Sequence, residues 1–195
     1  GRPFGNLLYS VLGNASGVVF EVAWWMHAVL ILAFMNYLPF SKHLHVLTSI
    51  PNVFLGPLSP TNSMEKIDFE AEGIEKFGVV DIEDLSWKSL LDGYTCTHCG
   101  RCTSVCPANL TGKVLDPRGI IVAIHDRTMD KAPLILKKEA GGELTPEEQV
   151  TWDKKLIGDY VNPDALWACT TCGACMQECP VNIEHVPAIV GMRRS

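Results

Sequence analysis

One cysteine spacing occurs twice in this chain and constrains its fold more than any other feature. The first run is Cys96-x2-Cys99-x2-Cys102-x3-Cys106, and a proline follows its last cysteine. The second run has the same spacing, is also followed by proline, and consists of Cys169, Cys172, Cys175 and Cys179. The two runs together contain all eight cysteines of the 195-residue chain.

This spacing is the one by which bacterial-type ferredoxins bind two [4Fe–4S] clusters. Three closely spaced cysteines bind irons of one cluster, whereas the cysteine before proline binds the other cluster. The chain is therefore predicted to be an electron carrier. Cys106 is predicted to bind the cluster of the second run, and Cys179 the cluster of the first. The predicted ligands are Cys96, Cys99, Cys102 and Cys179 for the first cluster, and Cys169, Cys172, Cys175 and Cys106 for the second.

Zinc and disulfides are the alternative uses of these cysteines. Zinc sites use pairs of CxxC motifs, but a twofold run of four cysteines ending in Cys-Pro is not a zinc pattern. Disulfides suit a small secreted scaffold better than a chain of this length with clustered thiols. Cluster assembly requires a reducing compartment, which favours the cytoplasm.

Composition excludes several functions. The formal net charge is −6 and no long basic run occurs, so nucleic acid is not expected as a partner. Neither a dinucleotide fingerprint nor a phosphate loop, a Ser–His–Asp pattern or a zincin motif is present, so the sequence predicts no self-contained catalytic site. The chain begins with Gly1 rather than Met, so it is expected to be processed, truncated or only part of a longer product.

Residues 18–40 form the most hydrophobic stretch. Glu21 is their only formal charge, and the segment between Glu21 and Lys42 is long enough to cross a bilayer. Trp24 and Tyr37 lie toward its two ends, as interfacial aromatic residues do. A buried core helix is the main alternative, and a secretory signal fits poorly because no basic segment directly precedes the run. A membrane span is favoured.

Two histidines of this region have a spacing that suits haem ligation. His27 and His45 are five helical turns apart, so one continuous helix would place both on one face, about 27 Å apart at 1.5 Å per residue. Such a helix could serve two haems, one near each membrane face, although Pro39 lies between the histidines and can end it. His43 would point elsewhere, and Lys42 is a candidate partner of a haem propionate.

The remainder of the chain is predicted to be mainly helical. An irregular segment is expected over residues 50–64 and a short hairpin within 65–80. Helix starts are predicted at Asp81, Pro117, Thr145 and Asn162, and a last helix from His185 through Arg194. The acidic run from Glu65 to Glu83 is expected to be solvated, and His98 and His125 are expected to pack or lie at the surface. His185 is a candidate for adjusting a cluster potential.

Two stretches resemble known families. Trp25-x-His27 with Leu38-Pro39-Phe40-Ser41-Lys42-x-x-His45 resembles the last transmembrane helix of nitrate reductase gamma-type cytochrome b. The resemblance implies that His27 and His45 are axial ligands of two b haems. The histidines that would pair with them must then come from helices that this sequence lacks or from another subunit.

The cysteine-rich part resembles the α-helical ferredoxin domains of succinate dehydrogenase and heterodisulfide reductase C-type subunits. With Trp87-Lys88-x-Leu90-Leu91-Asp92-x-Tyr94-x-Cys96, the whole chain is similar to membrane-bound heterodisulfide-reductase-like iron–sulfur proteins. The implied fold class is mainly α, with one transmembrane helix followed by an α-helical ferredoxin domain with two clusters. The implied domains are a membrane segment (1–50), an irregular connector (51–80) and the ferredoxin domain (81–195). A cysteine-rich CCG module would normally follow and is expected in a missing part or another subunit.

This resemblance implies a relay in the inner (cytoplasmic) membrane, with the ferredoxin domain on the cytoplasmic side. Electrons would pass between a soluble electron-transfer flavoprotein and menaquinone through the clusters and haem b. The alternative is a subunit of a heterodisulfide-reductase-like or sulfur-metabolism complex that couples disulfide chemistry to quinone. An assembly subunit with purely structural clusters, or a soluble ferredoxin with a buried N-terminal helix, are the remaining classes. Whether the chain is itself an enzyme is left open.

Overall fold

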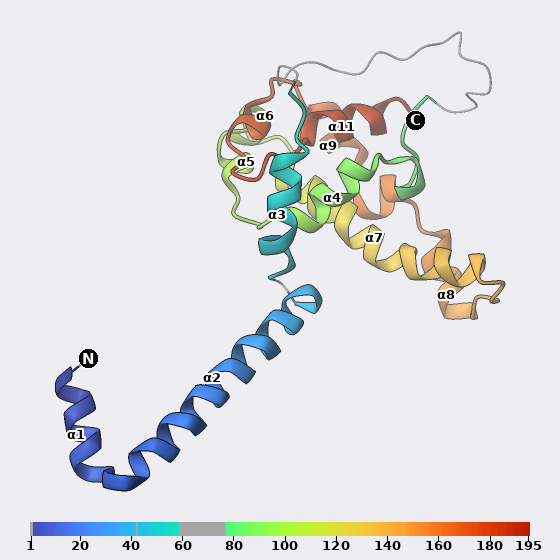
Figure 1. The fold of residues 1–195 in the computed structure, drawn as a ribbon. Coiled ribbons are helices and arrows are strands. Elements are labelled where there is room, and N and C mark those ends of the chain that lie inside the picture. The colour runs from blue at the N-terminus through green and yellow to red at the C-terminus, as the bar shows by residue number, and fades with distance from the viewer. Residues whose placement is uncertain (1, 42, 59–76) are drawn as a thin grey trace. The chain divides into compact units, whose positions relative to one another are not determined.

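The computed structural model describes residues 2–41, 43–58 and 77–195 (Figure 1). These residues form helices connected by loops and no β-strand, which confirms the predicted mainly α fold class. The chain divides into two compact units, Gly1–Leu44 and His45–Ser195, which are described separately. The predicted hairpin and most of the acidic run from Glu65 to Glu83 lie outside the described residues.

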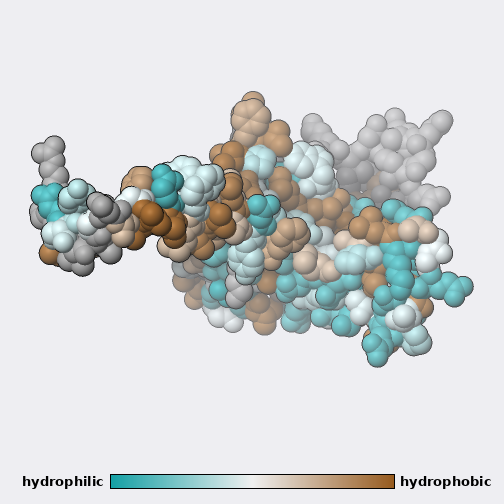
Figure 2. Space-filling view, turned by 60° about the horizontal axis from the view of Figure 1, so that its bottom comes forward, coloured by the Kyte–Doolittle hydropathy of each residue, from teal (hydrophilic) through white to brown (hydrophobic). Residues whose placement is uncertain are grey.

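The first unit contains two α-helices. Helix α1 spans Arg2–Leu12, a 3₁₀ turn spans Gly13–Ala15, helix α2 spans Ser16–Tyr37, and a second 3₁₀ turn spans Leu38–Phe40. One helical stretch in the described part of the chain, Gly17–Phe40, is long and apolar enough to cross a membrane. None of it is buried in the chain, and its apolar side chains are exposed (Figure 2). Its length, composition and exposure suit a membrane span better than a core helix.

The helix that carries His27 ends before His45. Helix α2 stops at Tyr37, and a separate helix, α3, begins at Leu44 and runs to Phe54. Pro39 accounts for the break, since proline lacks an N–H group and its ring clashes with the carbonyl four residues earlier. The expectation of one continuous helix for both histidines is therefore wrong, and their spacing does not define a common helical face.

Helix α3 also corrects the expected irregular segment at residues 50–64. It continues through Pro51, and the amide of Leu55 still donates to the Pro51 carbonyl at 2.8 Å. Asn52 is fully buried, whereas Val53 and Phe54 are exposed. Helix formation here is supported by packing of Asn52 against the rest of the second unit rather than by local propensity.

The remaining elements of the second unit surround one long helix. The bounds are a 3₁₀ turn at Ile82–Asp84, α4 Trp87–Thr95, α5 Arg101–Ser104, α6 Pro107–Leu110, α7 Pro117–Glu139, α8 Pro146–Asp153, a π-type turn (η4) at Leu156–Tyr160, α9 Pro163–Ala168, α10 Ala174–Gln177 and α11 His185–Arg193. Helix α7 contacts α4, α5, α8, α11 and the turn η4 (Figure 1). Helix α7 lies between the two cysteine runs in sequence. Its contacts with α5 and α11 also link the segments that contain or follow those runs.

Apolar side chains of α7 form the centre of the core. Ile121 and Ile124 are at most 1% exposed and pack with Leu115, Leu156 and Ile189. Burying one such side chain fully contributes about 1.5–3 kcal/mol to folding. The core thus connects the segments before and after the cysteine runs.

Most predicted helix starts are confirmed. Asp116 caps α7 with Pro117 at its first turn, Thr145 forms a capping box at α8, and Asn162 caps α9. Asp81 is the exception, because it caps only the 3₁₀ turn, while Ser86 caps the separate helix α4. The last helix ends at Arg193.

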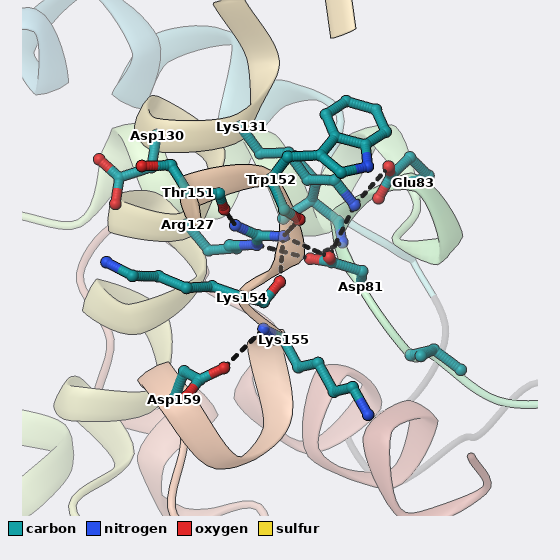
Figure 3. Close-up of polar contacts among 12 residues, drawn as sticks. Asp81, Glu83, Arg127, Asp130, Lys131, Thr151, Trp152, Lys154, Lys155 and Asp159 are labelled. Atoms are coloured by element: carbon teal, nitrogen blue, oxygen red, sulfur yellow. Dashed lines mark hydrogen bonds and ion pairs between the residues drawn. The ribbon is translucent and has the colours of Figure 1, made fainter. Parts of the chain in front are cut away.

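A buried arginine holds three segments of this unit together (Figure 3). Arg127 of α7 is fully buried; its Nε and Nη2 donate to the two oxygens of Asp81 at 3.0 and 2.7 Å. The same guanidinium donates to the backbone carbonyls of Thr151, Trp152 and Lys154 near the end of α8. The guanidinium of Arg127 therefore links α7 to Asp81 and to residues 151–154. Loss of this group would leave several buried polar atoms without a hydrogen-bond partner.

Candidate iron–sulfur centres

The two cysteine runs fold into the same backbone conformation. Gly100 and Gly173, which directly follow the second cysteine of each run, have φ values of 79° and 76°. His98 and Thr171, which precede that cysteine, both have φ of 54°. Each glycine is the N-cap residue of a four-residue helix, α5 or α10. Glycine adopts this left-handed conformation without a steric cost, which explains its presence at both positions.

The cysteines line two cavities, and each cavity takes its fourth cysteine from the other run. The first cavity is lined by Cys96, Cys99, Cys102 and Cys179. The second cavity is lined by Cys106, Cys169, Cys172 and Cys175. The fold therefore brings together the same two sets of thiols that the sequence predicts as ligand sets.

The chemistry of these thiols suits iron–sulfur clusters. All eight cysteines are free thiols. In the described ranges, no group of three His, Cys, Asp or Glu side chains is arranged to hold a single metal ion. Four cysteine thiolates around one cavity are the usual donor set for a [4Fe–4S] cluster.

The electrostatics of the thiols differ with burial. Burial and neighbouring thiolates raise the pKa of Cys96 to about 11 and that of Cys175 to about 12. By contrast, a hydrogen bond from the backbone N–H of Arg101 lowers the pKa of the exposed Cys99 thiol. Buried thiolates need a compensating positive charge, which iron would supply.

One contact connects the two cavities. Cys102 of the first cavity and Cys175 of the second are both buried, and they belong to one packed cluster with Val186 of α11. Met176 and Val190 pack against this cluster. One cysteine from each predicted ligand set thus belongs to the same cluster of buried apolar residues.

The loop that delivers Cys179 is held by buried polar groups. Lys88 Nζ lies 2.6 Å from Asp92 Oδ1 and donates to the carbonyl of Asn182 at 3.2 Å. Asp92 Oδ2 accepts from the amide of Glu184 at 3.0 Å. Helix α4 therefore fixes the chain directly after the second cysteine run.

Three further histidines have different surroundings. His185 is 1% exposed, lines the first cavity, and its Nδ1 lies 3.1 Å from the carbonyl of Ile183. Burial lowers the pKa of His185 to about 4, so its ring is neutral near pH 7. His98 is exposed, and the ring of His125 stacks edge-on against Tyr94. The expectation that His185 lies near a cluster site agrees with its position.

The predicted haem residues lie outside the cysteine sites. His27 is exposed on α2, and His45 is the second residue of α3 and half-buried. Lys42 lies outside the described residues. No local sequence pattern predicts that Asn52, Lys88 and Asp92 support a cysteine loop, because these contacts join residues that are distant in sequence.

Residues 95–183 match the family model of the 4Fe-4S dicluster domain. The chain is 34% identical over 209 residues to a probable iron-sulfur-binding oxidoreductase, FadF, of Bacillus subtilis, covering 96% of this chain and 30% of that protein. It is 36% identical to an EtfAB:quinone oxidoreductase of Syntrophomonas wolfei, covering 99% and 29%. A probable membrane-anchored ferredoxin of Chromohalobacter salexigens is 36% identical over 124 residues, covering 60% and 18%.

The chain therefore spans less than a third of the length of each of these relatives. No solved structure is significantly similar to it. The dicluster match, the two cysteine-lined cavities and the relatives together indicate an iron–sulfur electron-transfer protein, related to iron–sulfur oxidoreductases.

Proposed function

We propose that this chain relays electrons between a soluble flavoprotein and a quinone through two [4Fe–4S] clusters and b-type haem. The first cluster would be held by Cys96, Cys99, Cys102 and Cys179, and the second by Cys169, Cys172, Cys175 and Cys106. A [4Fe–4S] cluster, when bound, exchanges one electron at a time. The enzymatic activity of the complete complex would be that of a quinone-linked oxidoreductase.

The observation that carries this proposal is the exchange of the fourth cysteine between the two cavities. This exchange couples the two binding sites in one folding unit. Cys102 and Cys175 also share one buried apolar cluster, which links the two sites by packed side chains. Such a connection suits transfer between two centres better than two isolated structural sites would.

The membrane end of the relay would use His27 and His45 as axial ligands of b haems. The exposure of His27 on an apolar helix is compatible with a haem held between this helix and others. The second axial ligands would come from helices outside this sequence, and Lys42 would bind a haem propionate. The apolar helix would lie in the cytoplasmic membrane, with the cysteine sites on the cytoplasmic side.

The proposed soluble partner is an electron-transfer flavoprotein, and the proposed quinone is menaquinone. The name of the Syntrophomonas wolfei relative, an EtfAB:quinone oxidoreductase that matches 99% of this chain, supports a flavoprotein and a quinone as partners. The choice of menaquinone follows from the family resemblance of the sequence. Since the chain covers 29% of that relative, a CCG-type module in the rest of the protein or in another subunit remains part of the proposal.

The test is a dithionite-reduced minus oxidised optical spectrum of the detergent-extracted protein, with iron and haem quantified on the same sample. The proposal expects a b-type α-band and about eight non-haem irons per chain. Iron at that level without haem would remove His27 and His45 from the relay. Absence of reducible iron would contradict the electron-transfer function itself.

A second assay distinguishes the partner. Reduced electron-transfer flavoprotein is mixed with the extracted protein and a water-soluble menaquinone analogue. Flavoprotein-dependent quinone reduction supports the proposal, whereas release of thiols from a disulfide substrate without flavoprotein activity favours the heterodisulfide-reductase-like alternative.

A further inference from the structure

Helix α3 turns polar side chains toward the protein and apolar side chains away from it. The hydroxyl of Thr48 donates to the carbonyl of Tyr94 at 3.4 Å. One turn later, the fully buried Asn52 donates to Asp92 and to the carbonyl of Val181. A surface helix of a globular domain normally has the opposite arrangement, with its apolar side on the core. Helix α3 therefore presents to its surroundings the side that such a helix buries.

The outer side of α3 is a continuous apolar surface. Its side chains are 42–84% exposed and belong to Val46, Leu47, Ile50, Val53 and Phe54. Ile50 is two residues from both Thr48 and Asn52, about 200° around the helix, and so lies on the opposite side. No residue from 43 to 64 is Asp, Glu, Lys or Arg. Single exposed apolar side chains are normal, but a contiguous apolar patch marks a contact surface.

The position of α3 in the chain indicates what this surface contacts. The apolar stretch Gly17–Phe40 ends three residues before α3 begins at Leu44. A segment of four residues reaches at most about 14 Å. A membrane span at Gly17–Phe40 therefore keeps the beginning of α3 close to the membrane surface. An apolar helix face at that depth is stabilised in the boundary between lipid headgroups and acyl chains.

We propose that the outer side of α3 lies in the interface of the lipid bilayer that Gly17–Phe40 spans. This inference rests on the proposed function, because it takes that stretch as the membrane segment. It adds a second membrane contact, made by the unit that contains the cysteine sites. Asn52 binds α3 to Val181, which lines the first cysteine cavity. The bilayer contact thereby holds the loop after Cys179 close to the membrane surface.

A protein partner is the other conceivable occupant of this surface. Interfaces between proteins carry about one hydrogen bond per 100–200 Å². The five outer side chains of α3 are aliphatic or phenyl groups, which offer no hydrogen bond or ion pair to a partner. An acyl-chain environment requires neither, so the chemistry of this surface favours lipid.

The experiment is photocrosslinking of the full chain in nanodiscs of phosphatidylethanolamine and phosphatidylglycerol. The photoreactive residue p-benzoylphenylalanine replaces Phe54 or, separately, Ile50. Leu30, within the apolar stretch, is the positive control. Val150 is the negative control, because it is 65% exposed on α8, which lies apart from α3 (Figure 1). All four side chains are exposed, so the replacements leave the core packing intact.

Lipid adducts are measured by mass spectrometry after irradiation. We expect several-fold more lipid adduct at Phe54 and Ile50 than at Val150. Adducts at Leu30 without an excess at Phe54 or Ile50 would overturn the inference and leave the membrane segment in place. Crosslinks from Phe54 to protein in place of lipid would also overturn it. Absence of lipid adducts at every position, Leu30 included, would instead contradict the proposed membrane location.

Discussion

The amide of Asn52 donates a hydrogen bond of 2.9 Å to the carboxylate of Asp92. The same Nδ2 group also donates to the carbonyl of Val181 at 2.8 Å, two residues after Cys179. Asn52 lies on α3 and Asp92 on α4, and both are fully buried. The helix that follows the apolar span is thereby bound directly to the loop of a predicted cluster ligand.

Replacing Asn52 by Ala should weaken this junction. The change removes both hydrogen bonds and leaves the Val181 carbonyl without this donor, while Asp92 Oδ1 keeps Lys88; leaving a buried acceptor unpaired costs about 1–3 kcal/mol. Chemical denaturation followed by circular dichroism measures the loss. The iron of the first cluster should also be released at a lower denaturant concentration than in the unmodified protein.

Ser49→Ala is the matched control, because the Ser49 hydroxyl bonds only within its own helix, to the carbonyl of Val46. It should change the free energy of unfolding by less than about 0.5 kcal/mol. Equal effects of the two variants would mean that α3 contributes by its helicity alone and that the Asn52 contact is unimportant.

Asp81→Asn should destabilise the second unit strongly. It removes the anion that faces the buried guanidinium of Arg127 and the ammonium of Lys131, both 2.7 Å away (Figure 3). Breaking one partner of a buried ion pair costs about 3–5 kcal/mol. Glu139→Gln, an exposed change at the end of α7, is the control and should be nearly neutral. A similar stability of both variants would argue against the network.

The same carboxylate predicts an acid sensitivity. Burial alone would raise the pKa of Asp81, but hydrogen bonds from Arg127 and Lys131 outweigh burial and hold it below the ordinary value. The stability that Asp81 provides is therefore complete above the unfolded-state pKa of about 3.9, and it is lost as the pH falls through the lower, folded-state value. Unfolding measured from pH 6 to pH 2 should show this loss in the unmodified protein and less of it in Asp81→Asn.

The sequence allowed prediction of those features that local chemistry determines. The cysteine runs predict which thiols share a cavity, since the geometry of a cluster restricts how a run can be used. Asp116 and Thr145 predict helix starts because capping depends on neighbouring residues. Hydrophobicity and the absence of charge predict α2 in the same way.

Features that depend on distant contacts were missed or wrong. The histidine spacing predicts one helix that continues to His45, but the helix that carries His27 ends near Pro39. The prolines of residues 50–64 predict irregular structure, but Pro51 lies inside α3. The second case depends on the burial of Asn52 against residues 40 and 129 positions away, which no local pattern encodes. The surroundings of Arg127 are equally non-local, since its hydrogen-bond partners come from two segments, at Asp81 and at residues 151–154.

The exchange of cysteines predicts paired losses. Cys179→Ser should remove the first cluster, whose other cysteines lie in the first run, and Cys106→Ser should remove the second. Each variant should retain about four of eight irons. In a redox titration, the Arg101→Ala change applied on top of each variant identifies the surviving cluster, because Arg101 lines the first cavity and not the second. It should shift the remaining reduction wave only in Cys106→Ser.

If each run instead formed its own site, the surviving wave in Cys179→Ser would respond to Arg101→Ala. Ser104→Ala controls for the loss of a small polar side chain near the first run, since its hydroxyl bonds only the carbonyl of Arg101. It should retain all eight irons within the error of the iron measurement.

His27→Ala tests the membrane end of the proposed relay. If His27 is an axial ligand, the variant should lose at least one b-type haem per chain, while its non-haem iron stays near eight, because α2 and the cysteine sites belong to separate units. Haem is measured as the pyridine haemochrome and iron by chelation on the same sample. His43→Ala is the control, since His43 follows the end of α2 and its ring lies 6.4 Å from that of Phe34. Equal haem content in both variants and the unmodified protein would remove His27 from the haem site, and the electron path to quinone would then have to begin at the clusters.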